Sequence, residues 1–243
     1  MTMPMYVSPA QLMKDRADYA RKGISRGRAA VACTYSEGVL LCAENPSKTL
    51  RKAGEIYDKI GFMGVGKYSE FDQLRIAGIR HADLKGYSFS RDDVDARWLA
   101  NQYAQILGQY FTHEMKPLEV EMIVAEIGDS KEDDQIFHLL YDGTVMDTSS
   151  FVVIGGEAEL IRDRIQESWK AGSSLEESIK VTTKALSGPD KTFSSDELEV
   201  AILSRGNGRR AFTRIEGEEL NELLAYAREV SLTNAETNIW YRK

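Results

Sequence analysis

The first 28 residues of the chain, MTMPMYVSPAQLMKDRADYARKGISRGR (Met1–Arg28), lead into the first clear strand pattern, Ala29–Tyr35. Within them, Ser8-Pro9-Ala10-Gln11 has the features of a helix start. The Ser8 hydroxyl can accept the backbone N–H of Gln11 while the Gln11 side chain reaches back, and a proline at the first helical position loses no hydrogen bond. Apolar residues then recur at steps of three and four, at Met13, Ala17, Ala20 and Ile24. This period predicts one amphipathic helix, from Pro9 to Ser25.

The other positions of this helix and of the turn after it are strongly basic. They carry Lys14, Arg16, Arg21, Lys22, Arg26 and Arg28 against only Asp15 and Asp18. Taken alone, the pattern is typical of a surface helix that covers the edge of a sheet. A more specific role for the helix has to come from the sequence that follows it.

The composition is that of an ordinary globular chain. Its 243 residues are 42% hydrophobic and 28% charged, and no Pro/Gly/Ser-rich linker divides them. No apolar run approaches the ~20 residues that a membrane span needs, and the N-terminus lacks the charged and apolar regions of a signal peptide. A formal net charge of −7 argues against nucleic acid as the main partner. We therefore expect a single-domain cytoplasmic protein with no membrane and no nucleic-acid partner.

The cysteines and histidines form no recognisable chemical motif. Cys33 and Cys42 lie on two adjacent strand patterns, and if the turn between them centres on Glu37, their side chains point to opposite faces of the sheet. We expect two buried thiols rather than a disulfide. The three histidines, His81, His113 and His138, are far apart with no second ligand nearby, so we expect no metal site and no cofactor. Gly61-x-x-Gly64-x-Gly66 has the wrong spacing for a phosphate loop.

Strand and helix patterns follow one another in groups rather than singly. The strand patterns are Ala29–Tyr35, Val39–Ala43, Leu50–Tyr57, Gly61–Lys67, Val120–Ile127, Ile136–Tyr141, Phe151–Ile154, Leu198–Leu203 and Ala211–Ile215. The helix patterns after the first are Ser69–Gly78, Asp92–Phe111, Glu157–Trp169, Leu175–Leu186 and Glu218–Val230. This order does not fit the strict βαβ alternation of a parallel sheet. We predict an α+β fold with two mainly antiparallel sheets between helical layers.

Several ordered segments are specific enough to compare with known families. They are Ser8-Pro9, Tyr19-Ala20-Arg21, Gly38–Ser47, Glu55–Phe62, Gly66–Arg75, Gly86–Phe89, Arg91–Val94, Lys116–Glu121 and Ile154–Gly156. With the element order above, they resemble a 20S proteasome subunit, and closely the actinobacterial α-subunit. The resemblance implies an N-terminal-nucleophile hydrolase fold, a four-layer αββα sandwich, over residues 9–230. It also implies a gating segment at residues 1–8 and a polar C-terminal tail at residues 231–243.

Two classes of subunit share this fold, and the start of the first strand separates them. In the proteolytic β class, a threonine exposed there is the nucleophile, and its own α-amine helps to activate it. The equivalent position here is Arg28, whose guanidinium cannot act as a nucleophile. Glu44 and Lys52 fall where β-subunits carry the supporting acid and lysine, and Thr34 lies inside the strand. We therefore predict no catalytic residue in this chain and place the peptidase activity in a β-subunit partner.

Two other functions stay open at this point. The chain could be an active N-terminal-nucleophile hydrolase, a β-type protease, once a leader has been removed. It could also be a single-ring paralogue with another binding task. The first alternative requires a new nucleophile after processing, and neither threonine nor serine begins the strand.

For the α class, the resemblance implies a heptameric outer ring that templates a β ring and gates the pore in protein degradation, in the ubiquitin-like (Pup) pathway. The implied partners are further copies of the chain, a proteasome β-subunit, a ring-shaped ATPase activator with C-terminal docking tails, and protein substrates. The predicted gate consists of Thr2, Met3, Pro4, Met5, Tyr6, Val7, Ser8 and Pro9. The predicted activator pocket, between neighbouring subunits, uses Lys52 for the terminal carboxylate and Gly27 as the small residue at its rim. An unused N-terminal segment and a solvated strand lysine are the alternatives.

Overall fold

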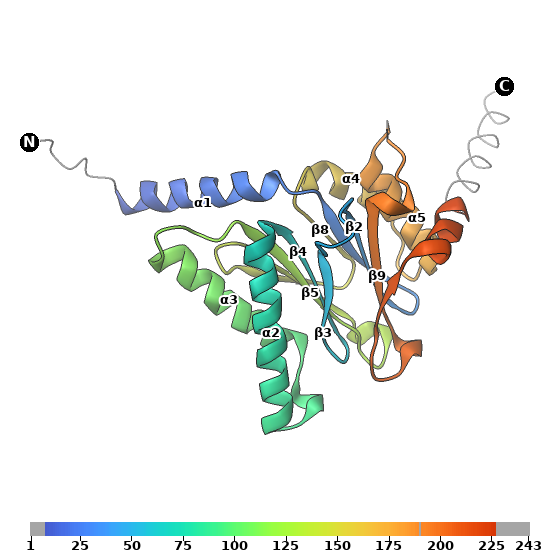
Figure 1. Ribbon diagram of the computed structural model, residues 1–243, viewed down its shortest axis with the longest axis horizontal. Helices are drawn as coiled ribbons and strands as arrows, with labels where there is room; N and C mark the ends of the chain where they lie inside the picture. Colours follow the sequence, from blue (N-terminus) through green and yellow to red (C-terminus); the bar gives the residue numbers. More distant parts are fainter. Residues whose placement is uncertain (1–7, 190, 227–243) are drawn as a thin grey trace, which may run out of the picture.

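The computed structural model describes residues 8–189 and 191–226, and Figure 1 shows the path of the chain. Its helices are α1 (Pro9–Ser25), α2 (Tyr68–Ser88), α3 (Ala96–His113), α4 (Ala158–Ser168) and α5 (Leu175–Ser187), and residues 217–226 are also helical. Its strands are β1 (Ala30–Tyr35), β2 (Gly38–Glu44), β3 (Ala53–Tyr57), β4 (Ile60–Gly66), β5 (Val120–Glu126), β6 (Gln135–Leu139), β7 (Val145–Thr148), β8 (Phe151–Ile154), β9 (Leu198–Ser204) and β10 (Phe212–Ile215). The predicted polar tail, residues 231–243, lies outside the described residues.

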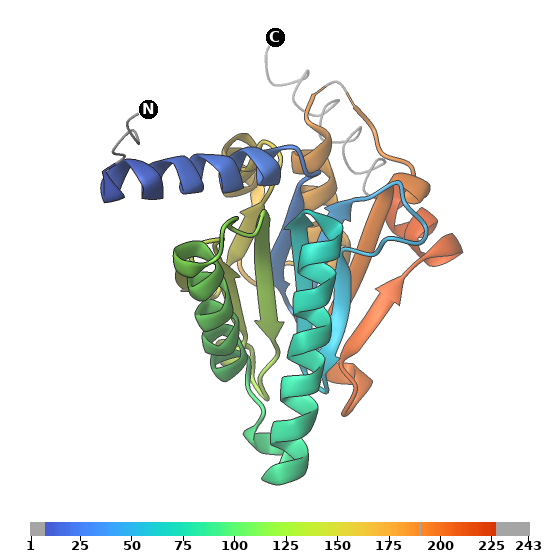
Figure 2. The same ribbon diagram turned by 60° about the vertical axis from the view of Figure 1, so that its left-hand side comes forward.

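The strands of the described chain form two five-stranded antiparallel sheets. One sheet has the order β10-β9-β2-β1-β8, and the other has the order β3-β4-β5-β6-β7. Helices α4 and α5 pack against the first sheet, and α2 and α3 pack against the second. Figure 2 shows α2 and α3 in front of their sheet, with α1 across one end of the molecule. The structure confirms the predicted α+β fold, a four-layer αββα sandwich.

Three apolar layers hold the four structural layers together. The layer between α4/α5 and the first sheet contains Val31 and Leu40, and the layer between the two sheets contains Ala32 and Leu41. The third layer, between the second sheet and α2/α3, contains Phe62 among its buried side chains. Because alternate residues of β1 face two of these layers, β1 is buried along its whole length. This explains the continuous apolar sequence of the first hairpin.

Helix α2 is longer than the sequence predicted. The prediction ended this helix at Gly78, whereas the structure continues it to Ser88. A Cβ atom at position 78 would lie 1.8 Å from the hydroxyl oxygen of Tyr103 in α3. The glycine therefore serves the close packing of α2 against α3 and does not end the helix.

Two further differences from the prediction have local causes. Helix α3 begins at Ala96 rather than at Asp92, because the Asp95 carboxylate caps it by accepting the N–H of Trp98 at 2.8 Å. Strand β7 was not predicted at all. It is short and has no buried residue, so its sequence lacks the apolar alternation that marks a half-buried strand.

The predicted placement of the two cysteines on opposite faces is wrong. The register pairs Tyr35 with Gly38, so the turn between β1 and β2 centres between residues 36 and 37 rather than on Glu37. This shift of half a residue puts Cys33 and Cys42 in the same apolar layer, beneath α4 and α5. Both are free, buried thiols, as expected. Burial raises the pKa of both, that of Cys42 to about 12.

Among residues 8–189 and 191–226, no helix has both the length and the apolar character that crossing a bilayer requires. The same part of the chain contains no group of three His, Cys, Asp or Glu side chains arranged to hold a metal ion. His138 is buried and lies 2.5 Å from a carboxylate oxygen of Glu121.

Candidate functional site

Helix α1 begins as its sequence predicts, with one difference. The Ser8 hydroxyl accepts the N–H of Gln11 at 3.2 Å, and Pro9 occupies the first turn. The Gln11 side chain instead donates to Asp15 at 2.7 Å, so only half of the expected capping box forms. Ser8 and Pro9 are both exposed. The other predicted gate residues, Thr2, Met3, Pro4, Met5, Tyr6 and Val7, lie outside the described residues.

One basic residue of α1 fixes the helix to α3. The Arg16 guanidinium donates to the carbonyl oxygens of Tyr110 at 3.0 Å, Phe111 at 2.6 Å and Glu114 at 2.5 Å. These carbonyls belong to the C-terminal end of α3, where backbone acceptors lack partners within the helix. Further along α1, Ile24 is buried in a small apolar cluster. The position of α1, and of the point where residues 1–7 join it, is therefore set by contacts with the rest of the fold.

The turn from α1 into β1 is packed too tightly for a side chain at Gly27. A Cβ atom there would lie 2.7 Å from Cγ1 of Val65 and 3.1 Å from the backbone nitrogen of Gly66. Gly155 and Gly156, between β8 and α4, adopt φ angles of 69° and 50° and approach the same turn. Packing within the chain thus already requires a small residue at Gly27, and its place at the rim of an activator pocket stays a prediction.

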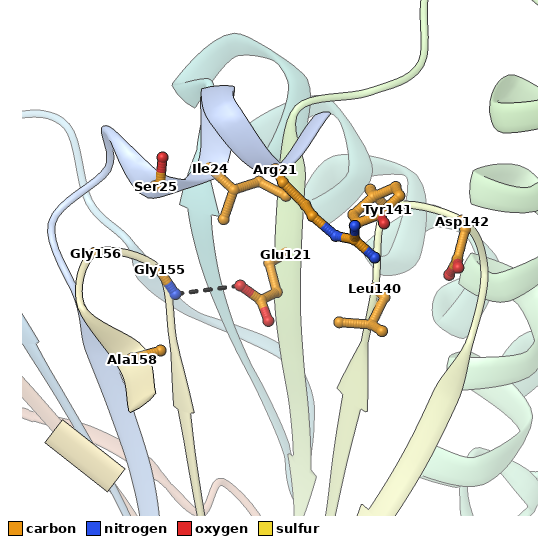
Figure 3. A pocket seen from close by; sticks show the side chains of 10 residues that line it. All are labelled: Arg21, Ile24, Ser25, Glu121, Leu140, Tyr141, Asp142, Gly155, Gly156 and Ala158. Atoms are coloured by element: carbon orange, nitrogen blue, oxygen red, sulfur yellow. Dashed lines mark hydrogen bonds between the residues drawn. The ribbon is translucent and has the colours of Figure 1, made fainter. Parts of the chain in front are cut away.

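A cavity of about 240 Å³ lies beside this turn, between the end of α1, β5 and the β8–α4 connection. Figure 3 shows Glu121 pointing toward Gly155, whose N–H donates to the carboxylate at 3.2 Å. The Arg21 guanidinium lies over the Tyr141 ring, 5.7 Å from its centroid. The charged groups that line the cavity are thus engaged with neighbours of the same chain, and we assign no chemistry to it.

Lys52 lies just before β3 and reaches the start of β1. Its ammonium group donates a 2.6 Å hydrogen bond to the backbone carbonyl of Arg28. Burial lowers its pKa to about 8, and the Arg28 guanidinium acts in the same direction, while Glu199 and Glu44 partly oppose the shift. With a pKa of about 8, Lys52 is still mostly protonated at pH 7. The structure therefore places a partly desolvated cation beside Arg28, the residue that the resemblance aligns with the nucleophile of β-subunits.

The backbone of Lys52 rests on Glu199, a residue that the sequence analysis did not single out. Glu199 is buried and accepts the N–H groups of Lys52 at 2.8 Å and Ala53 at 3.1 Å. Its carboxylate also accepts hydrogen bonds from Asn45 at 2.7 Å and Arg214 at 2.8 Å. The available signal was a single acidic residue inside the apolar strand pattern Leu198–Leu203. Such a buried charge is retained only where it has several partners.

The strand start itself carries ion pairs. The Arg28 guanidinium contacts Oε1 of Glu44, and the Lys191 ammonium lies 2.8 Å from the same oxygen. Burial raises the pKa of the Glu44 carboxyl, but Lys191 and Arg28 outweigh this effect and hold the pKa below its ordinary value. Lys191 is 147 positions from Glu44 in sequence, and no local motif marked it as part of the site.

Thr34 is not available as a nucleophile. It is buried in β1, and its hydroxyl donates to the backbone carbonyl of Ser149 at 3.1 Å. Glu44 and Lys52, which the resemblance aligns with the supporting residues of a β-subunit, both contact Arg28, the former in an ion pair. The four-layer αββα sandwich is the architecture expected of the N-terminal-nucleophile hydrolase class, and here an arginine in an ion pair precedes its first strand.

Comparison with known proteins assigns the family. The proteasome subunit family model matches residues 24–203. The chain is 56% identical over 224 residues to the proteasome subunit alpha of Acidimicrobium ferrooxidans, which covers 92% of this chain and 97% of that protein. It is 55% identical to the corresponding protein of Sanguibacter keddieii, over 93% of this chain and 90% of the relative, and 50% identical to that of Streptosporangium roseum, over 97% and 92%. The chain belongs to the proteasome subunit family, and these relatives are of the alpha type.

Proposed function

We propose that this α-type proteasome subunit contributes assembly, gating and docking, and that a β-subunit partner carries the peptidase activity. The observation that supports this most directly is Arg28 at the nucleophile position, with its guanidinium on Glu44 and its carbonyl on Lys52. A guanidinium is always protonated and cannot attack a peptide bond. The proposal includes a heptameric ring of this chain stacked on a β ring, in the cytoplasm.

Docking of an activator is proposed at Lys52. A partly desolvated ammonium is a strong partner for the terminal carboxylate of a tail, because the surrounding dielectric is lower than in water. Glu199 holds the backbone on which Lys52 stands, so the cation is positioned before a tail arrives. We propose that the tail belongs to a ring-shaped ATPase activator and that Gly27 lies at the rim of this pocket.

Gating is proposed for the residues that precede α1. The contacts of Arg16 with α3 and the burial of Ile24 keep α1 in place, so residues 1–8 start from a fixed point. In a ring, this segment would come from each copy toward the central pore and control the passage of unfolded protein substrates. We propose that these substrates are delivered by the ubiquitin-like Pup pathway.

Co-assembly with the β-subunit of the same organism tests the proposal. The chain alone should show no peptidase activity, and the mixture should form a four-ring barrel visible by electron microscopy. A threonine-directed inhibitor should abolish the activity of the barrel, since the nucleophile belongs to the β-subunit. Peptidase activity in the chain alone, or activity that survives the inhibitor, would show that this chain is itself a hydrolase. A single ring that does not bind the β-subunit would indicate a paralogue with another binding task.

A further inference from the structure

One oxygen of Glu44 is shared by two cations. Both the Arg28 guanidinium and the Lys191 ammonium contact Oε1, the latter at 2.8 Å. The side chains of Arg28 and Lys191 are 51% and 43% exposed, whereas that of Glu44 is only 19% exposed. Because both contact the same atom, the two positive groups lie next to each other and depend on Glu44 for neutralisation.

Lys52 adds a third cation to this group. Its ammonium binds the backbone of Arg28, and Glu44 is one of the two carboxylates that favour its protonated form. The second carboxylate, Glu199, is committed to two backbone N–H groups and to Asn45 and Arg214.

Glu197, an acid near the three cations, already accepts other hydrogen bonds. Glu197 lies 3.9 Å from Lys191, and its carboxylate also accepts hydrogen bonds from Ser194 at 3.0 Å. Glu44 is thus the one acid in direct contact with two of the three cations among the described residues. The group as a whole has a surplus of positive charge.

We propose that Glu44 occupies the place of a docking carboxylate, and that a carboxylate ligand displaces Glu44 from Arg28 and Lys191 and is then held by these two cations together with Lys52. This inference rests on the proposed docking at Lys52. It adds Arg28 and Lys191 as ligand-binding residues and Glu44 as a competitor for them. Exchange of one carboxylate for another changes the number of ion pairs little, so a single tail binds weakly. Tight attachment then requires several tails on one ring.

The test uses Glu44→Gln, which keeps the size of the side chain and removes its charge. The probe is acetyl-trialanine with a free carboxylate, and the same peptide with a C-terminal amide serves as the uncharged form. Protection of Lys52 from acetic anhydride at pH 8, measured by mass spectrometry on the particle co-assembled with the β-subunit, reports binding. Glu44→Gln should reach half-protection at about tenfold lower peptide concentration than the unmodified chain, as expected when one charge-assisted contact no longer has to be broken. The amide should protect neither protein.

Two further variants separate the exchange from simpler effects. Glu55→Gln is the matched control, because Glu55 has a similar exposure of 22% and its partner is Arg210, at 2.6 Å. It makes the same change in net charge and should leave the affinity unaltered. Arg28→Gln introduced into Glu44→Gln should reverse the gain, since it removes one of the released cations. Isothermal titration calorimetry with the same peptides measures the affinities without acetylation of Lys52.

The outcomes distinguish displacement of Glu44 from docking at Lys52 itself. Protection of Lys52 that is equal or weaker in Glu44→Gln would overturn the competitor and leave docking at Lys52 intact. A gain that persists after Arg28→Gln would also overturn it, since Arg28 would then take no part in holding the carboxylate. If the free carboxylate peptide binds none of the variants, the proposed docking at Lys52 is wrong and this inference falls with it.

Discussion

Lys52 is an unfavourable residue for the stability of the isolated chain. Burial lowers its pKa to about 8, compared with an ordinary value of about 10.5. Between these two values the unfolded chain binds more protons than the folded chain, so the free energy of unfolding rises with pH across that window. Below pH 8 the full cost of keeping the buried charge is present. A residue that weakens the fold at neutral pH is consistent with a role in binding.

Lys52→Met should therefore stabilise the isolated chain at pH 7 while it removes docking. The pKa of Lys52 falls from 10.5 to about 8, and each pKa unit corresponds to about 1.4 kcal/mol. The lost hydrogen bond to Arg28 offsets about 1 kcal/mol of this, which leaves a gain of about 2–3 kcal/mol. The gain should shrink as the pH rises from 8 toward 10, because the lysine is then neutral in the folded chain. Guanidinium chloride unfolding at several pH values measures both effects, and activator-stimulated degradation by the assembled particle should be lost.

Lys59→Met is the control for this experiment. Lys59 is bound by Asp129 at 2.6 Å, which raises its pKa, so its charge favours the folded state slightly. Its replacement should give no stabilisation at pH 7. A Lys52→Met chain that is less stable than the unmodified one at pH 7, or whose gain is the same at pH 7 and 10, would contradict the assignment of Lys52 as a buried charge.

At the scale of the element, α1 joins two features that are far apart in sequence. Its first turn follows the predicted gate, and its middle is held by Arg16 on the carbonyl end of α3. Its last turn leads through Gly27 and Arg28 into the candidate docking site. A single helix thus connects the segment proposed to close the pore with the residues proposed to bind an activator.

Deletion of Thr2–Val7 should speed the degradation of an unfolded protein such as casein by the assembled particle. The segment is proposed to narrow the pore, and casein has to pass it as an extended chain. A short fluorogenic peptide diffuses through a narrower opening, so its hydrolysis should change less. Both rates are measured on the same preparation.

Deletion of residues 238–243 removes the same number of residues from the other end of the chain and should leave both rates unchanged. If the particle without Thr2–Val7 degrades casein no faster than the full-length particle, these residues are not a barrier.

The sequence predicts an element well when the residues that determine it lie within the element itself. The period of α1, its cap at Ser8 and the apolar hairpin of β1 and β2 are local patterns, and all three were predicted. The continuation of α2 past Gly78 depends on Tyr103 of another helix, which no local pattern contains. The same reason explains why Lys52 was predicted from a family resemblance, while Glu199, which binds its backbone, and Lys191, which pairs with Glu44, were not.

At the scale of the whole molecule, small side chains set the distance between the two sheets. Ala30 and Ala32 of β1 face the layer between the sheets and are fully buried. The same cluster contains Leu41, the neighbour of Ala32 on β2, and Met63 of the opposing sheet. Close-packed layers of this kind have little room for larger side chains. The spacing of the sandwich, and with it the position of Lys52 relative to Arg28, depends on these residues.

Ala32→Leu should lower the free energy of unfolding by about 1–3 kcal/mol, because a larger side chain forces the two sheets apart. Chemical denaturation followed by circular dichroism measures the loss. Leu84→Ala is the control: this leucine is 67% exposed on α2, and its truncation should change stability by less than about 0.5 kcal/mol. Full stability in Ala32→Leu would mean that the layer between the sheets contains unfilled space.

The two thiols in the layer beneath α4 and α5 are built-in probes of the rate at which the fold opens. Cys33 and Cys42 are the two cysteines of the sequence, both are buried, and burial disfavours the thiolate that alkylating reagents attack. Iodoacetamide can therefore label them only when β1 and β2 separate from the helices above. Because these strands lie in the middle of their sheet, the rate of labelling counts the openings of the sandwich itself, in the free subunit or in an assembled ring, without any introduced probe.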